Sequence, residues 1–257
     1  MKKLLMPLLA LAAPLAACTE TEHKVVDRDV PVEVMPVDGH TLGFWTMQTR
    51  ACTDVAALCV NDNAPYGNDL VLEDAGLQPL ATRDLVRGDS ADTGGQIIQL
   101  NADGETAPAQ LRTADNSVFA NTPIGDVFAI HLRFKPAAGD ALQTVLSLGS
   151  AVFNVEASVD SVVVEFPAQD KRLLLPLDGR GDWTNLYVAA DGQNVRVELD
   201  CKAVAGFAKA AGAPLLSRDA TGLMLGARPD TPAREHFSGL LELLRVADSD
   251  EADLFCR

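Results

Sequence analysis

Aromatic and basic residues are scarce in this chain of 257 residues. Aromatic side chains make up 5% of it, with two tryptophans and two tyrosines, so few are available for stacking on sugar rings. Lysine and arginine number 21 against 36 aspartates and glutamates, which gives a formal net charge of -15. An acidic chain repels phosphate backbones and gains nothing from counterion release. We therefore expect no nucleic acid among its partners.

Several active-site patterns are also missing from the sequence. No serine stands in a Gly-x-Ser-x-Gly elbow, and the glycine-rich segments lack the lysine of a phosphate-binding loop. The four histidines are scattered along the chain, so no nucleophile can be matched with a base. One of them, His131, lies in an alternating segment on the face opposite the apolar residues, where we expect a surface side chain. These absences favour a protein that is not an enzyme.

The sequence has no apolar run of about 20 residues, the length that a membrane-spanning helix needs. It begins instead with two lysines and a shorter apolar run from Leu4 to Leu15, which is typical of an export signal. The following Leu-Ala-Ala-Cys ends at Cys18 and resembles a bacterial lipobox. This resemblance implies that residues 1–17 are removed and that Cys18 is lipidated, which would anchor the protein to a membrane. Thr19 in place of aspartate favours the outer membrane of the bacterial cell envelope.

Residues 18–39 carry mixed charges, two prolines and no helical period, so we expect an extended, flexible tether. At residues 42–45 the composition changes to aromatic and apolar, and we place a single domain at residues 40–257.

Five cysteines are present, and with Cys18 assigned to lipid the other four form an even set in an exported chain. Of the three possible pairings we favour Cys52 with Cys59 and Cys201 with Cys256. A zinc site on these four residues is the alternative, although no Cys-x-x-Cys pair is present.

The strongest structural signal lies in residues 181–201, where two alternating segments flank an Asp191-Gly192 pair. Such a pair between alternating segments is typical of a tight β-hairpin, because glycine tolerates the positive φ of the turn. Short alternating segments separated by turn residues recur along the chain, which predicts an all-β sandwich or jelly roll. The further strands are expected at 128–134, 143–148, 152–156, 161–166, 172–175, 222–225 and 240–246, whereas 202–213 is expected to form a short helix or a loop.

Four stretches resemble the laminin-G-like and thrombospondin-N-terminal-like domains of the concanavalin A-like superfamily. They are YGNDLVL at 66–72, the segment 128–134 with LSLG at 146–149, the hairpin at 183–200, and FSGLLELLRV at 237–246. The resemblance implies a two-sheet antiparallel jelly-roll sandwich in which Trp45 and Trp183 are buried, and it supports a disulfide between Cys201 and Cys256. Residues 76–125 fit the pattern less well, and we expect loops and edge strands there.

Domains of this kind bind glycans, proteins or calcium. Calcium would be held by acidic loop residues, for which Asp160, Asp178 and Asp182 are the candidates, whereas Asp191 is already explained by its turn. Glycosidases of this fold carry two carboxylates on one strand, and the nearest pattern, Glu156 with Asp160, has the wrong spacing.

We therefore expect a lipid-anchored, non-catalytic binding or adhesion module of the bacterial envelope that recognises a glycan or a protein. The alternatives are a structural accessory lipoprotein of an envelope assembly and a divergent glycosidase or lyase.

Overall fold

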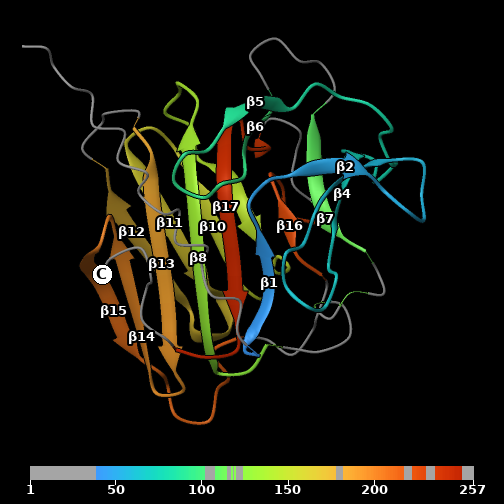
Figure 1. Cartoon of the computed structure of the whole chain (residues 1–257). Helices are drawn as coiled ribbons and strands as arrows, with labels where there is room; N and C mark the ends of the chain where they lie inside the picture. Colours follow the sequence, from blue (N-terminus) through green and yellow to red (C-terminus); the bar gives the residue numbers. More distant parts are fainter. Residues whose placement is uncertain are drawn as a thin grey trace, which may run out of the picture. The chain divides into compact units, whose positions relative to one another are not determined.

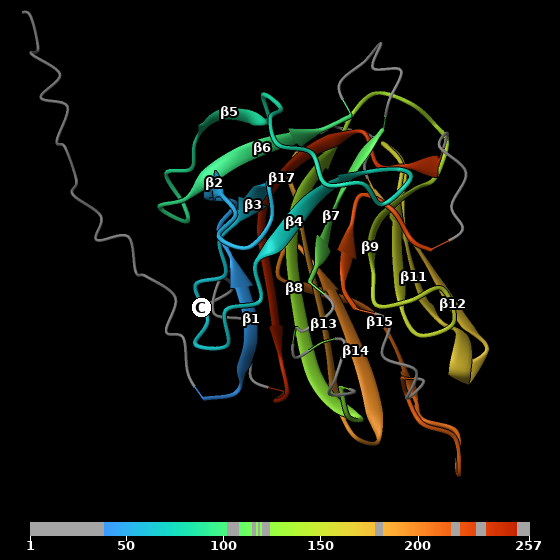
Figure 2. The same ribbon diagram turned by 90° about the vertical axis from the view of Figure 1, so that its right-hand side faces the viewer.

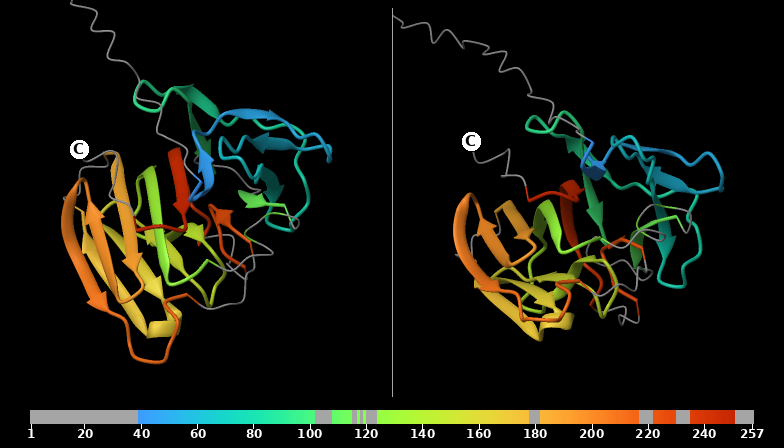
Figure 3. Two further views of the ribbon diagram at one scale, coloured as in Figure 1. Left: turned by 60° about the horizontal axis from the view of Figure 1, so that its bottom comes forward. Right: turned by 90° about the horizontal axis from the view of Figure 1, so that it is seen from below.

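The computed structural model describes residues 39–101, 108–114, 117, 119, 124–177, 182–216, 222–229 and 235–250. The predicted signal peptide, Cys18 and almost all of the tether lie outside these residues. Within them the chain forms two antiparallel β-sheets that face each other as a sandwich, which confirms the predicted fold class (Figure 1). Figures 2 and 3 show the two layers from other sides. No helix in this described part is long and apolar enough to span a membrane.

The first sheet has the strand order β15-β14-β13-β8-β17-β6-β5, and β1 also pairs with β17. Its strands are β1 (Thr41–Trp45), β5 (Val86–Asp89), β6 (Gln96–Leu100), β8 (Val127–Pro136), β13 (Thr184–Asp191), β14 (Asn194–Leu199), β15 (Lys202–Ala208) and β17 (Gly239–Ala247).

The second sheet has the order β12-β11-β10-β9-β16-β7-β4-β3-β2. Its strands are β2 (Thr49–Ala51), β3 (Leu58–Val60), β4 (Leu70–Asp74), β7 (Ala109–Thr113), β9 (Gln143–Ser147), β10 (Asn154–Ala157), β11 (Ser161–Phe166), β12 (Lys171–Pro176) and β16 (Met224–Leu225). One turn of 3-10 helix, Pro167–Gln169, connects β11 to β12.

Aromatic side chains from both sheets meet in the core. Phe128 of β8 contacts the rings of Phe153 and Phe166, with 6.5 Å between ring centres in each case. Phe166 in turn lies 5.1 Å from Phe207 of β15. All of these rings except Phe207 are fully or almost fully buried. Their burial is a major source of stability, since each large aromatic side chain removes about 150–250 Å² from water.

The predicted hairpin is confirmed as β13 and β14. Gly192 has a φ of 88°, which a side chain would disfavour. The carboxylate of Asp191 accepts hydrogen bonds from the backbone N–H groups of Gln193 and Asn194, at 2.8 and 2.7 Å. These bonds hold the pKa of Asp191 below its usual value, and the bond from Asn194 has the larger effect. This aspartate therefore serves the turn.

The predicted helix or loop at 202–213 is wrong for residues 202–208, which form β15, whereas residues 209–213 lie in a loop. Lysine and alanine favour a helix, but Ala205 and Phe207 alternate towards the core opposite Val197 and Val195 of β14. Gly206 fits the strand because a Cβ there would lie 2.6 Å from the carbonyl oxygen of Val195. Pairing with β14 has therefore overridden local helix propensity.

The buried carboxylate of Asp62 fixes the loop between β3 and β4. It accepts backbone hydrogen bonds from Phe44, Ala64 and Asn68 at 2.8–2.9 Å. The carbonyl of Asn68 then accepts the indole N–H of Trp45 at 2.9 Å, and Trp45 is fully buried as predicted. Asp62 thus joins β1 to the segment that precedes β4.

We predict that Asp62→Ala lowers the free energy of unfolding by about 3 kcal/mol, because three buried N–H groups lose a charged acceptor. Asp84→Ala, at a side chain that is 90% exposed, serves as the control and should change stability by less than about 0.5 kcal/mol. Urea denaturation of both variants checks this. Equal stability of the two variants would contradict the role given to Asp62.

Candidate functional site

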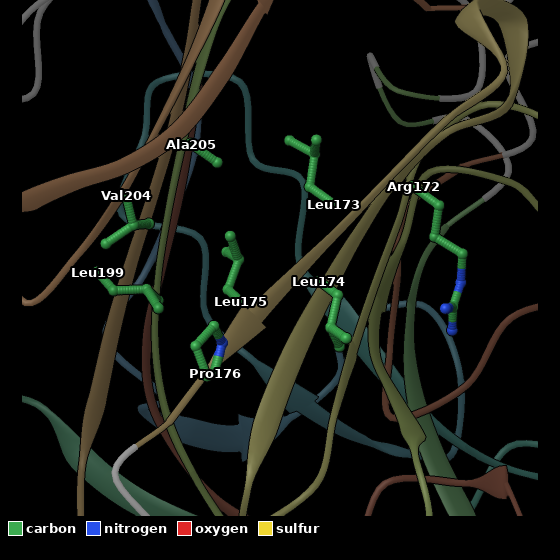
Figure 4. A pocket seen from close by; sticks show the side chains of 8 residues that line it. All are labelled: Arg172, Leu173, Leu174, Leu175, Pro176, Leu199, Val204 and Ala205. Carbon is green, nitrogen blue, oxygen red and sulfur yellow. The ribbon is translucent and has the colours of Figure 1, made fainter.

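The first strands of the two sheet orders, β12 and β15, lie on the same side of the sandwich (Figure 1). Between them runs an open groove with a volume of about 450 Å³. Its lining is formed by Arg172, Leu173, Leu174, Leu175, Pro176, Leu199, Val204 and Ala205. We call this feature the edge groove (Figure 4).

Alternation along β12 places its leucines on both sides of the strand. Leu173 and Leu175 lie on the side that faces Val204 and Ala205, and Leu174 lies on the other (Figure 4). Leu174 is 63% exposed, the highest value among the large apolar side chains of the described residues. Val204 on the opposite wall is 46% exposed. Both strands therefore offer apolar surface to a ligand.

A β-bulge explains why two consecutive residues of β15 line the groove. Glu198 pairs with Ala203 and Val197 pairs with Ala205, so Val204 is an extra residue without an opposite partner in β14. A bulge turns a side chain away from the regular alternation of a strand. It thereby allows Val204 to join Ala205 in the lining.

As far as the described residues show, the lining is aliphatic, with no aromatic side chain and one charged residue, Arg172. Lys171 precedes Arg172, and Lys202 pairs with the lining residue Leu199, so basic side chains flank the lining at these two points. Sugar sites use aromatic faces and convergent polar groups, whereas apolar side chains of a protein fit an aliphatic groove.

Arg172 also belongs to a cluster of four charged side chains on the outer face of the second sheet. Its guanidinium lies 3.0 Å from a carboxylate oxygen of Glu165 and 3.5 Å from one of Glu156. Arg228 Nη1 lies 3.1 Å from Glu156 and 3.6 Å from Glu165. Glu156 and Glu165 come from the neighbouring strands β10 and β11. We call these four residues the ion-pair cluster.

The carboxylate beside Glu156 is not that of Asp160, whose spacing in the sequence is already wrong for a catalytic pair. Glu156 lies beside Glu165, and Asp160 is an exposed residue in the turn after β10. Burial, followed by the negative charge of Glu165, raises the pKa of Glu156. Both carboxylates are held by arginines. Sequence reasoning missed Glu165 and Arg228 because their proximity depends on cross-strand register and on a loop.

The predicted calcium residues are not brought together. Asp160 and Asp182 are both exposed, and Asp178 lies outside the described residues. Within the described ranges no group of three or more His, Cys, Asp or Glu side chains could hold a metal ion. Calcium binding stays a prediction.

Two cysteine predictions have different outcomes. Cys52 and Cys59 form the predicted disulfide, with their Cα atoms 5.1 Å apart. This bond leaves no set of four thiolates for the alternative zinc site. Cys201 is also disulfide-bonded, but its predicted partner Cys256 lies outside the described residues.

The prediction that His131 is a surface residue is wrong. Its side chain is 4% exposed on the outer face of the first sheet, between Arg245 of β17 and Tyr187 of β13. Burial, followed by the charges of Arg245 and Arg133, lowers the pKa of His131 to about 3. Alternation correctly assigned its face but could not show that large neighbours cover it.

The prediction that Trp183 is buried also needs correction, because this side chain is half-buried. The guanidinium of Arg133 lies 5.5 Å from the centre of its ring, a cation–π contact. Arg133 is itself paired with Glu242 at 2.8 Å. One part of the indole is therefore held by the protein, and another part is open to solvent.

No protein-family model and no curated protein matches the chain. Solved structures do match. A structure of botulinum neurotoxin type C, whose cell entry depends on interaction with two ganglioside molecules, has a TM-score of 0.56 at 10% identity, covering 84% of this chain and 49% of that one. The binding domain of botulinum neurotoxin DC, solved with rat synaptotagmin II, gives 0.55 at 8% identity, covering 83% and 49%.

The CBM40 of a Ruminococcus gnavus IT-sialidase, bound to α2,3 sialyllactose, matches with a TM-score of 0.45 at 20% identity, covering 52% of this chain and 82% of that one. This chain spans about half the length of the neurotoxin chains. At these identities the neurotoxin likeness shows the β-sandwich fold alone. Membership of the laminin-G-like family stays a prediction.

We predict that Glu156→Gln changes how stability depends on pH. Folding raises the pKa of Glu156 above its unfolded value of 4.5. The stabilisation that this shift supplies is fully present below pH 4.5, and it is lost as the pH rises through the pKa of the folded chain. The wild-type chain should therefore lose stability relative to Glu156→Gln between about pH 4 and pH 7. Urea denaturation of both chains at the two pH values measures the difference. A wild-type chain that gains relative stability over this range would contradict the prediction.

Proposed function

We propose that the chain is a lipid-anchored, non-catalytic binding module of the bacterial envelope, and that it docks a protein partner in the edge groove. The observation that carries the proposal is that two exposed apolar side chains, Leu174 of β12 and Val204 of β15, line it. The neurotoxin structures support a binding role through the fold alone, because a sandwich of this type takes part in binding in those proteins. Anchoring is supported by the lipobox that ends at Cys18.

The size and chemistry of the edge groove favour a protein ligand. A volume of about 450 Å³ lies within the usual range for ligand pockets, and it accommodates a few side chains of a partner. Leu174 and Val204 are 63% and 46% exposed, so their full burial would contribute roughly 1–2 kcal/mol each. Hydrophobic contact therefore supplies the driving force at this site.

Glycan binding is the second candidate, and it is favoured by Trp183. This half-buried indole offers an aromatic face, which the lining of the edge groove does not have. A role as an accessory protein of an envelope assembly is compatible with a groove that docks protein.

The anchoring part of the proposal predicts that Cys18→Ala abolishes lipid attachment. The variant should move from the membrane fraction to the soluble fraction and lose incorporation of labelled fatty acid, because no acyl chain remains to enter the bilayer. Membrane association that is unchanged in Cys18→Ala would contradict lipid anchoring.

The binding part predicts that Leu174→Ser lowers capture of a partner from envelope extracts about tenfold, the equivalent of about 1.4 kcal/mol of lost apolar contact. Val55→Ser is the matched control, since Val55 is 43% exposed and lies between β2 and β3, at the opposite end of the second sheet's strand order from β12. Quantitative pull-downs with the wild-type chain and both variants compare the bound protein.

A glycan array with and without calcium, probed with the same three chains, separates the candidates. Glycan binding that is independent of Leu174, together with no captured protein, would overturn the proposal in favour of a glycan-binding module. Turnover of a polysaccharide would overturn the non-catalytic reading.

A further inference from the structure

Five consecutive residues of β12, Arg172 to Pro176, line the edge groove. Successive side chains of a strand point to opposite faces, so a groove over one face would meet only every second residue. A groove that meets all five therefore runs along the edge of the strand, where the backbone N–H and C=O groups point. Figure 4 shows these side chains on both sides of β12.

The edge of β12 that faces the groove is open. On its other edge β12 pairs with β11 over all six residues, from Lys171 opposite Phe166 to Pro176 opposite Ser161. Among the described residues no other strand pairs with β12, which ends the order of its sheet. Apart from the β11 ladder, the described part of the chain has no hydrogen bond to the backbone of β12. Such an edge is a template for another extended chain.

We propose that the partner contributes an extended segment that pairs with β12 as an added strand and fills the edge groove. This inference rests on the proposed function, and it specifies the form of the partner. Main-chain hydrogen bonds would supply part of the affinity, and pockets for alternate side chains would supply the specificity.

The chemistry of the two walls defines the segment. Side chains on one face of the added strand would enter the groove against Leu199, Val204 and Ala205, which fits aliphatic residues at alternate positions. The other face would lie beside the exposed Leu174.

The charges at the groove point to a carboxylate in the segment. Among the described residues no acidic side chain lines the groove, and Arg172 is already balanced by Glu165 and Glu156, whereas the neighbouring Lys171 forms no ion pair with a described residue. Opposite charge favours a glutamate or aspartate at the end of the segment near Lys171. The expected ligand is thus an extended acidic segment with alternating aliphatic side chains.

A pair of N-methylated peptides tests strand addition. The probe is a synthetic heptapeptide of alternating valine and threonine with one terminal glutamate, used with the full-length chain. One twin is N-methylated on its valines and the other on its threonines. Only alternate N–H groups of an added strand face its neighbour, so one twin should bind at least about tenfold more weakly than the parent, while the other stays within about twofold.

Hydrogen exchange gives an independent readout. Binding of the parent peptide should slow exchange of alternate amides within residues 171–175, and exchange in the β2–β3 hairpin should be unchanged. The Leu174→Ser variant should bind the parent more weakly than Val55→Ser does.

The outcomes separate this inference from the proposed function. Equal binding of the two twins, no slowing at residues 171–175, or no binding of the parent peptide would each overturn strand addition. Leu174-dependent capture of an envelope protein would in those cases still support the docking function. If neither the pull-down nor the binding of the parent peptide depends on Leu174, both strand addition and the docking function are overturned.

Discussion

The pairing of β17 with its neighbours is the constraint on which the first sheet depends. β17 pairs with β8 along one edge, while its other edge pairs with β6 through residues 239–241 and with β1 through residues 244–247. β6 and β1 join the sheet only through β17, so the sheet cannot be completed before this late segment of the chain is available. Long-range pairing of this kind is slow to form, because loop-closure entropy is lost before the contacts stabilise the fold. The core residues Leu241, Leu244 and Val246 then hold β17 against the second sheet.

In the first sheet β17 is an inner strand and β15 is the outer strand at one end of the order. On the same side, β12 is the outer strand of the second sheet. The aromatic layer of the core reaches this side through the contact of Phe166 with Phe207. Beyond that contact the facing side chains are leucine, valine and alanine, which are too small to close the gap between the two edges. The edge groove therefore follows from the size of side chains at the margin of the core, together with the bulge at Val204.

Much of the fold could be predicted from the sequence, because alternation and turn residues are local signals. The hairpin of β13 and β14, the aromatic strand β8 and the strand β11 all follow from them. β15 could not be predicted in this way, since its lysine and alanine residues favour a helix until β14 provides a partner. The burial of His131 depends on the register between β8 and β13, which are distant in the sequence. The proximity of Glu156 and Glu165 depends on the register between β10 and β11. The candidate site was missed for the same reason: its two walls are 30 residues apart at Leu174 and Val204, and only the position of both strands at sheet edges brings them together.

An edge strand has a ladder on one side only, and β12 still keeps regular pairing over all six residues. The ion-pair cluster accounts for part of this order, because Arg172 is tied to Glu165 on β11 and to Glu156 one strand further on. Its two arginines and two glutamates balance in charge, so the cluster adds little to the repulsion within a chain of net charge -15. Side-chain contacts across β11 and β10 thus hold β12 on the edge that pairs with β11, and no other described strand pairs with it. The same residue, Arg172, belongs both to this support and to the groove lining, so the order of the edge and the shape of the groove depend on one another.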